Sequence, residues 1–178
     1  SVHNSCMAGK QRLGSAARRT ENDLITRLYV DASGPHASLY TSGNENIVNT
    51  TNGAATNNPA LSIAGLQDAM TVWNSMVDEN GEPIMREGAT LVVPPALEVV
   101  AENILNAIQL WITAGSAGGV GDNGSGGGFQ QLNVQNWMKN KLQLVVNPYI
   151  PLVATTANGN TSWYIFASPN YSREAMRI

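Results

Sequence analysis

One stretch of the sequence constrains the fold more than any other: TLVVPPALEVVAENILNAI, which begins at Thr90. Its first four residues, through Val93, are apolar or β-branched and favour a short strand. Pro94 and Pro95 end that strand and suit the first turn of a helix, where the missing N–H is not needed. Apolar residues then recur at helical spacing, namely Leu97, Val100, Ala101, Ile104, Leu105 and Ile108. The stretch therefore predicts a strand, a double-proline turn and a helix in direct succession.

Helical and strand-like patterns also alternate along the rest of the chain. Residues 11–30 predict a long helix with one apolar stripe, made by Leu13, Ala16, Ala17, Leu24, Ile25 and Leu28. Residues 31–58 lack a sustained period and are expected to form an extended loop. A second helix is expected to open at Pro59, capped by Asn58, with a buried face of Leu61, Leu66, Ala69, Met70, Trp73, Met76 and Val77, and to stop at the turn-rich DENGEP. Two strand-like runs follow, LQLVVNPYI from Leu142 and TSWYIFASP from Thr161, which predicts an α+β fold with one core.

Composition excludes several classes of function. The 178 residues fit one domain, and 13% charged against 43% hydrophobic residues predicts a largely neutral polar surface. A net charge of −3 gives no global attraction to nucleic acid or an anionic membrane, and no apolar run is long enough to span a bilayer. Half of the ten basic residues lie between Lys10 and Arg27. We interpret them as one face of a helix that is solvated or forms ion pairs. Because the chain starts with Ser and stops in SREAMRI, we expect it to be a fragment of a longer subunit.

The glycine-rich stretch GGVGDNGSGGG, from Gly118 to Gly128, contains the GxGxxG spacing of a dinucleotide site. Such a site needs a strand directly before the first glycine and a helix that begins at the last glycine. It also needs an Asp or Glu about twenty residues later. Here a helix-like segment precedes the glycines, more glycine follows, and the acid position falls on Lys141 or Leu142. No Gly-Lys-Ser/Thr follows either. We therefore expect a loop, residues 115–128, that is mobile unless a neighbour orders it.

Catalytic and metal-binding groups are sparse. His3 and His36 are the two histidines and both lie in polar segments, so no nucleophile–base pair can be assembled. Glu98 and Glu102 share a helix face without further ligands, and Cys6 is the single cysteine, so no zinc pattern or intrachain disulfide exists. Four tryptophans, Trp73, Trp111, Trp137 and Trp163, are expected to be core or interface anchors. The sequence predicts no enzyme, no cofactor and no metal.

Three blocks in fixed order resemble the major capsid proteins of tailed phages, particularly the Mu-like major head protein group, which includes capsid parts of protease–capsid fusion proteins. The first block matches at Leu91, Val92, Val93, Pro94, Pro95, Leu97, Ala101, Ile104 and Leu105, the second at Val145, Val146 and Pro148, and the third at Trp163, Tyr164, Phe166, Ala167 and Pro169. Weaker matches upstream, LSIAGLQDAM, DENGEPI and GSAARRTENDLITRLY, extend the resemblance over residues 12–178.

The resemblance implies a capsid fold, represented mainly by its axial domain. Residues 1–58 would hold the end of the spine helix and a peripheral-domain loop, and residues 59–178 the axial domain. It implies subunits that close into pentamers and hexamers of an icosahedral shell around phage DNA, assembled in the host cytoplasm with a scaffold or prohead protease and without a membrane. DNA would be contacted only indirectly.

Eight residues are candidate subunit contacts: Arg18, Arg19, Glu21, Gly119, Asp122, Gly124, Phe129 and Trp137. Two other interpretations stay open, a tail or decoration binding module and a nucleotide-binding α/β enzyme that uses the glycine-rich loop.

Overall fold

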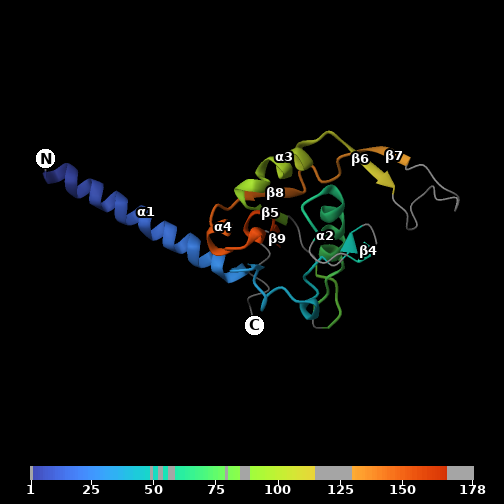
Figure 1. Cartoon of the computed structure of the whole chain (residues 1–178), viewed down its shortest axis with the longest axis horizontal. Helices are drawn as coiled ribbons and strands as arrows, with labels where there is room; N and C mark the ends of the chain where they lie inside the picture. Colours follow the sequence, from blue (N-terminus) through green and yellow to red (C-terminus); the bar gives the residue numbers. More distant parts are fainter. Residues whose placement is uncertain are drawn as a thin grey trace.

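The computed structural model describes residues 2–48, 50–51, 54–55, 59–78, 80–84, 89–114 and 130–167 (Figure 1). A compact body of helices and short strands carries a long helix that extends from it on one side and a β-hairpin on the other. The elements, in chain order, are α1 (Val2–Tyr29), β1 (Val30–Asp31), β2 (Gly34–Pro35), η1 (Ser42–Asn44), β3 (Thr50–Thr51), β4 (Ala54–Ala55), α2 (Ile63–Ser75), β5 (Ala89–Val93), η2 (Pro95–Leu97), α3 (Glu98–Asn106), β6 (Gln109–Ala114), β7 (Gln130–Gln135), β8 (Leu142–Val146), α4 (Ile150–Val153), η3 (Ala157–Asn160) and β9 (Tyr164–Ala167). The fold is α+β, as the sequence predicted.

The centre of the body is a three-stranded sheet in the order β8-β5-β9. β5 pairs in parallel with β8, from Ala89↔Leu142 to Val93↔Val146, and antiparallel with β9, from Ala89↔Ala167 to Val92↔Tyr164. All three strands were predicted from their β-branched and aromatic runs. β5 is the middle strand and is buried on both faces, which agrees with its nearly uninterrupted apolar sequence.

Two apolar clusters cover the two faces of this sheet. Side chains of one strand alternate between faces, so Leu91 and Val93 pack with α2 and α3 in one cluster, while Val92 faces the other. The first cluster comprises Leu61, Leu66, Ala89, Leu91, Val93, Ala101, Ile104, Leu105, Met138 and Leu142. The second comprises Tyr29, Val30, Val92, Ile150, Val153, Ala154 and Tyr164, and it holds the C-terminal end of α1 against the body.

The double-proline turn forms as predicted, but its helix is shorter than the apolar pattern suggested. Pro95 opens the 3₁₀ turn η2, and α3 follows and ends at Asn106. Ala101, Ile104 and Leu105 are buried as expected, whereas Val100 is 41% exposed and Ile108, beyond the helix end, is 77% exposed. The apolar stripe of α3 is therefore narrower than the sequence pattern.

The second helix begins four residues later than predicted. Its first residue is Ile63 and its cap is Ser62, whose Oγ accepts a hydrogen bond from the Gly65 N–H at 3.0 Å. This side-chain acceptor satisfies one free N–H of the first helical turn and marks Ser62 as the cap. Asn58 lies outside the described residues, and Val77, expected on the buried face, is 47% exposed. The turn after the helix forms as expected, with Gly81 at φ 81° and Asp78 Oδ1 accepting from the Asn80 and Glu82 N–H groups.

A β-hairpin follows α3 where the sequence indicated a helix-like segment. β6 pairs antiparallel with β7 from Gln109↔Gln135 to Ala114↔Gln130, so the interpretation of the residues before Gly119 as helical is wrong. The glycine-rich residues 115–128 connect these two strands along the chain, and they lie outside the described residues. The connection between α3 and β8 therefore contains a hairpin.

The segment 31–58 was expected as an extended loop, and it contains short regular pieces. β1 pairs with β2, β3 pairs with β4, and Ser42–Asn44 forms a 3₁₀ turn. Gly34 adopts φ 124°, and a Cβ there would lie 2.9 Å from the Asn158 Cβ, so this close approach requires glycine. The segment thereby packs along η3 rather than standing free.

Candidate subunit interface

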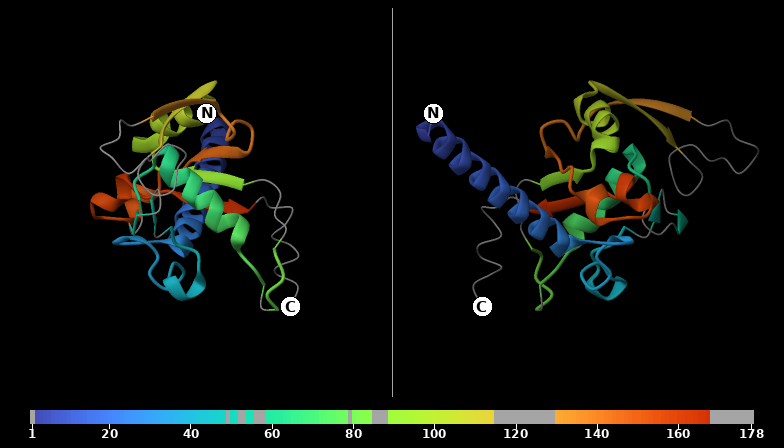
Figure 2. Two further views of the ribbon diagram at one scale, coloured as in Figure 1. Left: turned by 90° about the vertical axis from the view of Figure 1, so that its right-hand side faces the viewer. Right: turned by 60° about the vertical axis from the view of Figure 1, so that its left-hand side comes forward.

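The long helix α1 leaves most of its surface uncovered. Every described residue from Arg12 to Ile25 is exposed except Asp23, which is intermediate, and the helix projects from the body in Figure 1 and in the right view of Figure 2. The apolar residues that the sequence places along one side of this helix are not buried. Leu13 is 74%, Leu24 59%, Ile25 51% and Leu28 73% exposed. Such a row of large apolar side chains on a projecting helix marks an interaction surface.

This exposed row points away from the body. At about 100° per residue, Leu13, Leu24 and Leu28 lie within about 60° of one another around the helix axis, with Ala17 between them. Thr26 and Tyr29, which contact the body, are buried and lie roughly 130–170° away from that row. We call Leu13, Ala17, Leu24 and Leu28 the outer stripe of α1. Because the buried residues of the helix face the body from the opposite side, the body cannot also cover this stripe.

The base of α1 is tied to the sheet through one side chain. The Asn147 Nδ2 donates to Thr26 Oγ1 at 2.9 Å and to the Tyr29 hydroxyl at 2.6 Å, while its Oδ1 accepts from the Tyr149 N–H. The Asn147 N–H donates to the Val93 carbonyl at the end of β5. One residue after β8 therefore sets the direction in which α1 leaves the body.

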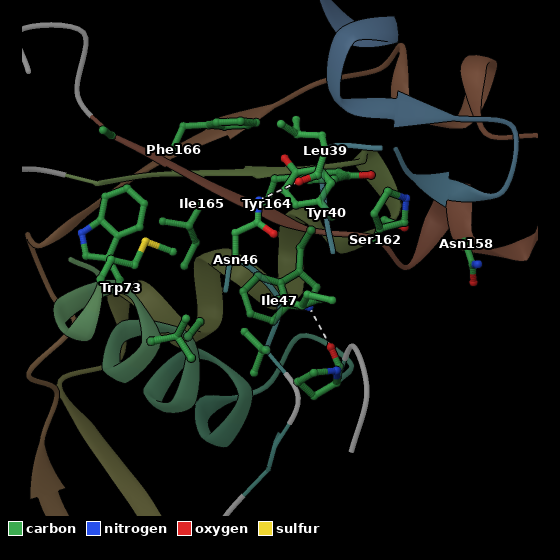
Figure 3. A pocket seen from close by; sticks show the side chains of 18 of the residues that line it. Leu39, Tyr40, Asn46, Ile47, Trp73, Asn158, Ser162, Tyr164, Ile165 and Phe166 are labelled. Carbon is green, nitrogen blue, oxygen red and sulfur yellow. Dashed lines mark hydrogen bonds between the residues drawn. The ribbon is translucent and has the colours of Figure 1, made fainter. Parts of the chain in front are cut away.

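The second uncovered surface is a cavity of about 490 Å³ beside β9 (Figure 3). α2 forms one wall through Ala69, Val72, Trp73 and Met76, the segment from Pro35 to Val48 forms the other, and Thr161 to Ala167 form the floor. We call this the aromatic groove. Consecutive residues of β9 line it, so the groove follows the outer edge of the strand, opposite β5.

Among the described residues, no charged side chain lines the aromatic groove. The described residues that line it are Pro35, Leu39, Tyr40, Asn46, Ile47, Val48, Pro59, Ala69, Val72, Trp73, Met76, Asn158, Thr161, Ser162, Trp163, Tyr164, Ile165, Phe166 and Ala167. Burial raises the pKa of Tyr164 to about 12, and burial also raises the pKa of the Tyr40 phenol. Both phenols are therefore neutral at physiological pH, so an apolar ligand fits this surface better than an ion.

The sequence did not identify this groove as a site. The floor of the groove is formed by the run TSWYIFASP, which was predicted as a strand. The sequence signal that could have marked it as a site is the high proportion of aromatic residues in that run. Tyr164 packs edge-on against Tyr29 at 5.0 Å between ring centroids, and Trp163 Nε1 donates to the Pro59 carbonyl at 2.9 Å. Which face of the strand remains open depends on long-range packing, which a local pattern does not contain.

The candidate contact residues fall into three groups. Arg18, Arg19 and Glu21 are exposed on α1, where they are available to another molecule. Trp137 is half-buried against the core, and the Lys141 ammonium lies 5.5 Å from its ring centroid. The remaining four, Gly119, Asp122, Gly124 and Phe129, lie outside the described residues. Of the four described candidates, three therefore lie on α1 and Trp137 lies against the core, and the eight residues stay a prediction.

The hairpin is anchored at its base by Asn136, a residue that no sequence pattern singled out. Asn136 is 8% exposed, and its Nδ2 donates to the carbonyls of Ile104, Leu105 and Ala107 at 2.7, 3.3 and 2.9 Å. Its Oδ1 accepts from the Met138 N–H at 3.0 Å. Asn136 thus satisfies the free carbonyls at the end of α3 and fixes the hairpin to that helix.

No metal-binding cluster of three or more His, Cys, Asp or Glu side chains occurs among the described residues. Glu98 and Glu102 are both exposed on α3, and His36 lies in a turn where its Nδ1 accepts from the Ser38 N–H. Within the same part of the chain, no helix combines the length and apolar character that crossing a membrane requires.

Comparison with known proteins gives one match. A family model described as phage capsid protein matches residues 8–177, nearly the whole chain. No curated protein and no solved structure matches the chain. A match of this extent covers α1 from Ala8 onward, the groove and the sheet, and the capsid fold agrees with the mixed helices and strands described above. The chain therefore belongs to the family of phage capsid proteins, which are structural components of the virion.

Proposed function

We propose that this protein is the major head subunit of a tailed phage, which assembles through pentamers and hexamers into the icosahedral shell around the phage DNA. The observation that carries the proposal is the outer stripe of α1, where large apolar side chains are 59–74% exposed on a helix that its own body does not cover. A shell subunit is surrounded by neighbours, so such a surface becomes buried on assembly. Its role is mechanical and needs no catalytic residue, cofactor or metal.

The arrangement of elements supports a division of labour along the chain. Residues 1–58 contain α1 and the turns at its base, which correspond in the proposal to the end of a spine helix and a peripheral-domain loop. Residues 59–178 contain the sheet, α2, α3 and the hairpin, which correspond to an axial domain. The hairpin projects from the side of the body opposite α1 (Figure 1), so the glycine-rich loop would approach neighbouring subunits near the capsomer axis.

Within the family, we place the protein among the Mu-like major head proteins. The three sequence blocks around Val93, Val146 and Tyr164 favour the Mu-like major head proteins, including those made as fusions with a protease. In the structure these blocks form β5 with its proline turn, β8 and β9, which together make the central sheet. Assembly would take place in the host cytoplasm with a scaffold or prohead protease. The net charge of −3 gives the chain no overall attraction to DNA, so contact with the packaged DNA would be indirect.

Sedimentation velocity of the full-length gene product tests this proposal. With a scaffold supplied, the protein is expected to sediment as capsomers and shells, far faster than a monomer. A protein that remains monomeric under all such conditions is not a shell subunit.

A further inference from the structure

We infer that the outer stripe of α1 in one subunit binds in the aromatic groove of a neighbouring copy. This inference rests on the proposed shell function and names the two surfaces that meet in it. Both surfaces are apolar and uncovered in the described part of the chain. They cannot meet within one copy, because the outer stripe points away from the body to which the groove belongs.

The two surfaces are complementary in shape and polarity. An amphipathic helix binds a groove through apolar side chains spaced one or two turns apart, and Ala17, Leu24 and Leu28 have that spacing. The stripe from Leu13 to Leu28 is about 22 Å long. The groove offers about 490 Å³ of space between α2 and the Pro35–Val48 segment, and the described residues of its lining include aliphatic and aromatic side chains and no charged group.

The charge distribution favours contact between α1 of one copy and the body of a neighbouring copy over contact between two α1 helices. The helix holds five of the ten basic residues and two of the thirteen acidic ones, so it carries a formal charge of +3 while the rest of the chain carries −6. Two α1 helices therefore repel each other, whereas α1 of one copy attracts the body of another. The exposed residue Glu45 precedes the groove residue Asn46, so an acidic side chain borders the groove.

The geometry of such a contact also fits a closed ring. Two different surfaces of the same chain meet, so the contact is heterologous and can be repeated around a rotation axis. A symmetric contact between two α1 helices would stop at a dimer. The inferred contact can therefore contribute to rings of five or six subunits.

Cysteine crosslinking between two singly labelled chains tests the inference. In a Cys6→Ser background, one chain carries Leu24→Cys on the outer stripe and the other carries Leu39→Cys at the groove wall. Assembled particles of the mixture are treated with a short bis-maleimide and separated under denaturing conditions. We expect a crosslinked dimer in the mixture and none in particles of either chain alone.

Each other outcome has a definite meaning. A dimer from the Leu24→Cys chain alone shows that α1 pairs with α1 and overturns the inference. Particles of the mixture without any crosslink overturn it as well, while the shell function stands. If the unmodified protein forms no particles, the proposed function itself fails, so the two failures are distinguishable.

Stripe variants supply a second measurement that does not depend on labelling. Leu24→Asn with Leu28→Asn removes two apolar anchors and is expected to weaken association by roughly tenfold or more. Ile108→Asn is the matched control, since Ile108 is 77% exposed and lies outside both surfaces. Circular dichroism checks that both variants fold. Equal association of the stripe variant and the control would overturn the inference.

Discussion

The carboxamide of Asn147 donates a hydrogen bond of 2.6 Å to the hydroxyl of Tyr29, which joins the end of β8 to the last turn of α1. The same nitrogen reaches Thr26 Oγ1 at 2.9 Å. Thr26 is fully buried and Tyr29 is 8% exposed, so this junction is shielded from water although the rest of the helix is not. The direction of α1, and with it the position of the outer stripe, depends on these bonds.

Replacing Asn147 with Ala is expected to lower the free energy of unfolding by about 1–2 kcal/mol. The change removes two side-chain donors and leaves the oxygens of Thr26 and Tyr29 without that partner. Urea denaturation followed by circular dichroism measures the difference. Asn103→Ala, on the exposed face of α3, is the control and should change stability by less than about 0.5 kcal/mol. Equal stabilities of the two variants would show that the junction contributes nothing.

Asn136→Leu is expected to be more damaging, by about 2–3 kcal/mol or more. The buried carboxamide serves the carbonyls of Ile104, Leu105 and Ala107, and a leucine leaves them unsatisfied in the interior. Thermal unfolding of the variant beside wild type gives the effect. Retention of the wild-type melting temperature would contradict the anchoring role assigned to this residue.

Tyr164 is expected to make the protein sensitive to alkali. Burial raises the pKa of its phenol from the ordinary 10 to about 12, so the folded state holds this proton more tightly than the unfolded chain. The resulting stability is complete below pH 10 and is lost as the pH rises toward 12. Tyr164→Phe should therefore lose less stability than wild type between pH 9 and pH 11.5 (roughly the interval in which an unfolded tyrosine ionises), as urea titrations at fixed pH will show.

At neutral pH the same variant should be as stable as wild type, or more stable by up to about 1 kcal/mol. The Tyr164 hydroxyl is buried without a hydrogen-bond partner among the described residues, so its removal relieves an unsatisfied group. The ring contacts with Tyr29 and Phe166 remain available to phenylalanine. A loss of more than about 1 kcal/mol at pH 7 would mean that the hydroxyl has a stabilising partner.

Two glycine substitutions should act with opposite sign. A Cβ on Gly159 would lie 2.5 Å from the Ala154 carbonyl oxygen and 3.1 Å from the Pro151 Cα, so Gly159→Ala is expected to destabilise the fold by about 1–3 kcal/mol. A methyl group added to Gly14, on α1, would meet no neighbouring atom within 4 Å, and Gly14→Ala should stabilise the helix by about 0.5–1 kcal/mol. Thermal melts of the two variants that shift in the same direction would contradict this account.

The parts of the fold that follow from local chemistry could be predicted from the sequence. β5 with its double-proline turn, the long helix α1 and the strands β8 and β9 all carry β-branched, proline or helical-period signals within a few residues. The predicted start of α2 is four residues early because Pro59 suits a first helical turn, whereas the Ser62 cap decides where the helix begins. In both the correct and the incorrect cases, the deciding interactions lie close together in the sequence.

The hairpin and the groove could not be predicted because they depend on distant partners. Gln109–Ala114 continues the apolar rhythm of α3, and its strand conformation comes from pairing with Gln130–Gln135 across the glycine-rich segment. Likewise, the apolar stripe of α1 was visible in the sequence, but the sequence could not show that the stripe faces away from the body. Exposure is a property of the whole packed chain.

A cryo-electron microscopy map of particles formed by the full-length protein would show both the shell and the neighbours of each subunit. We expect an icosahedral shell of pentamers and hexamers in which the body with β5, β8 and β9 lies near each capsomer axis, and α1 extends to a neighbouring subunit with its outer stripe covered. Particles without five-fold and six-fold capsomers, or a shell in which Leu24 and Leu28 remain exposed to solvent, would contradict it.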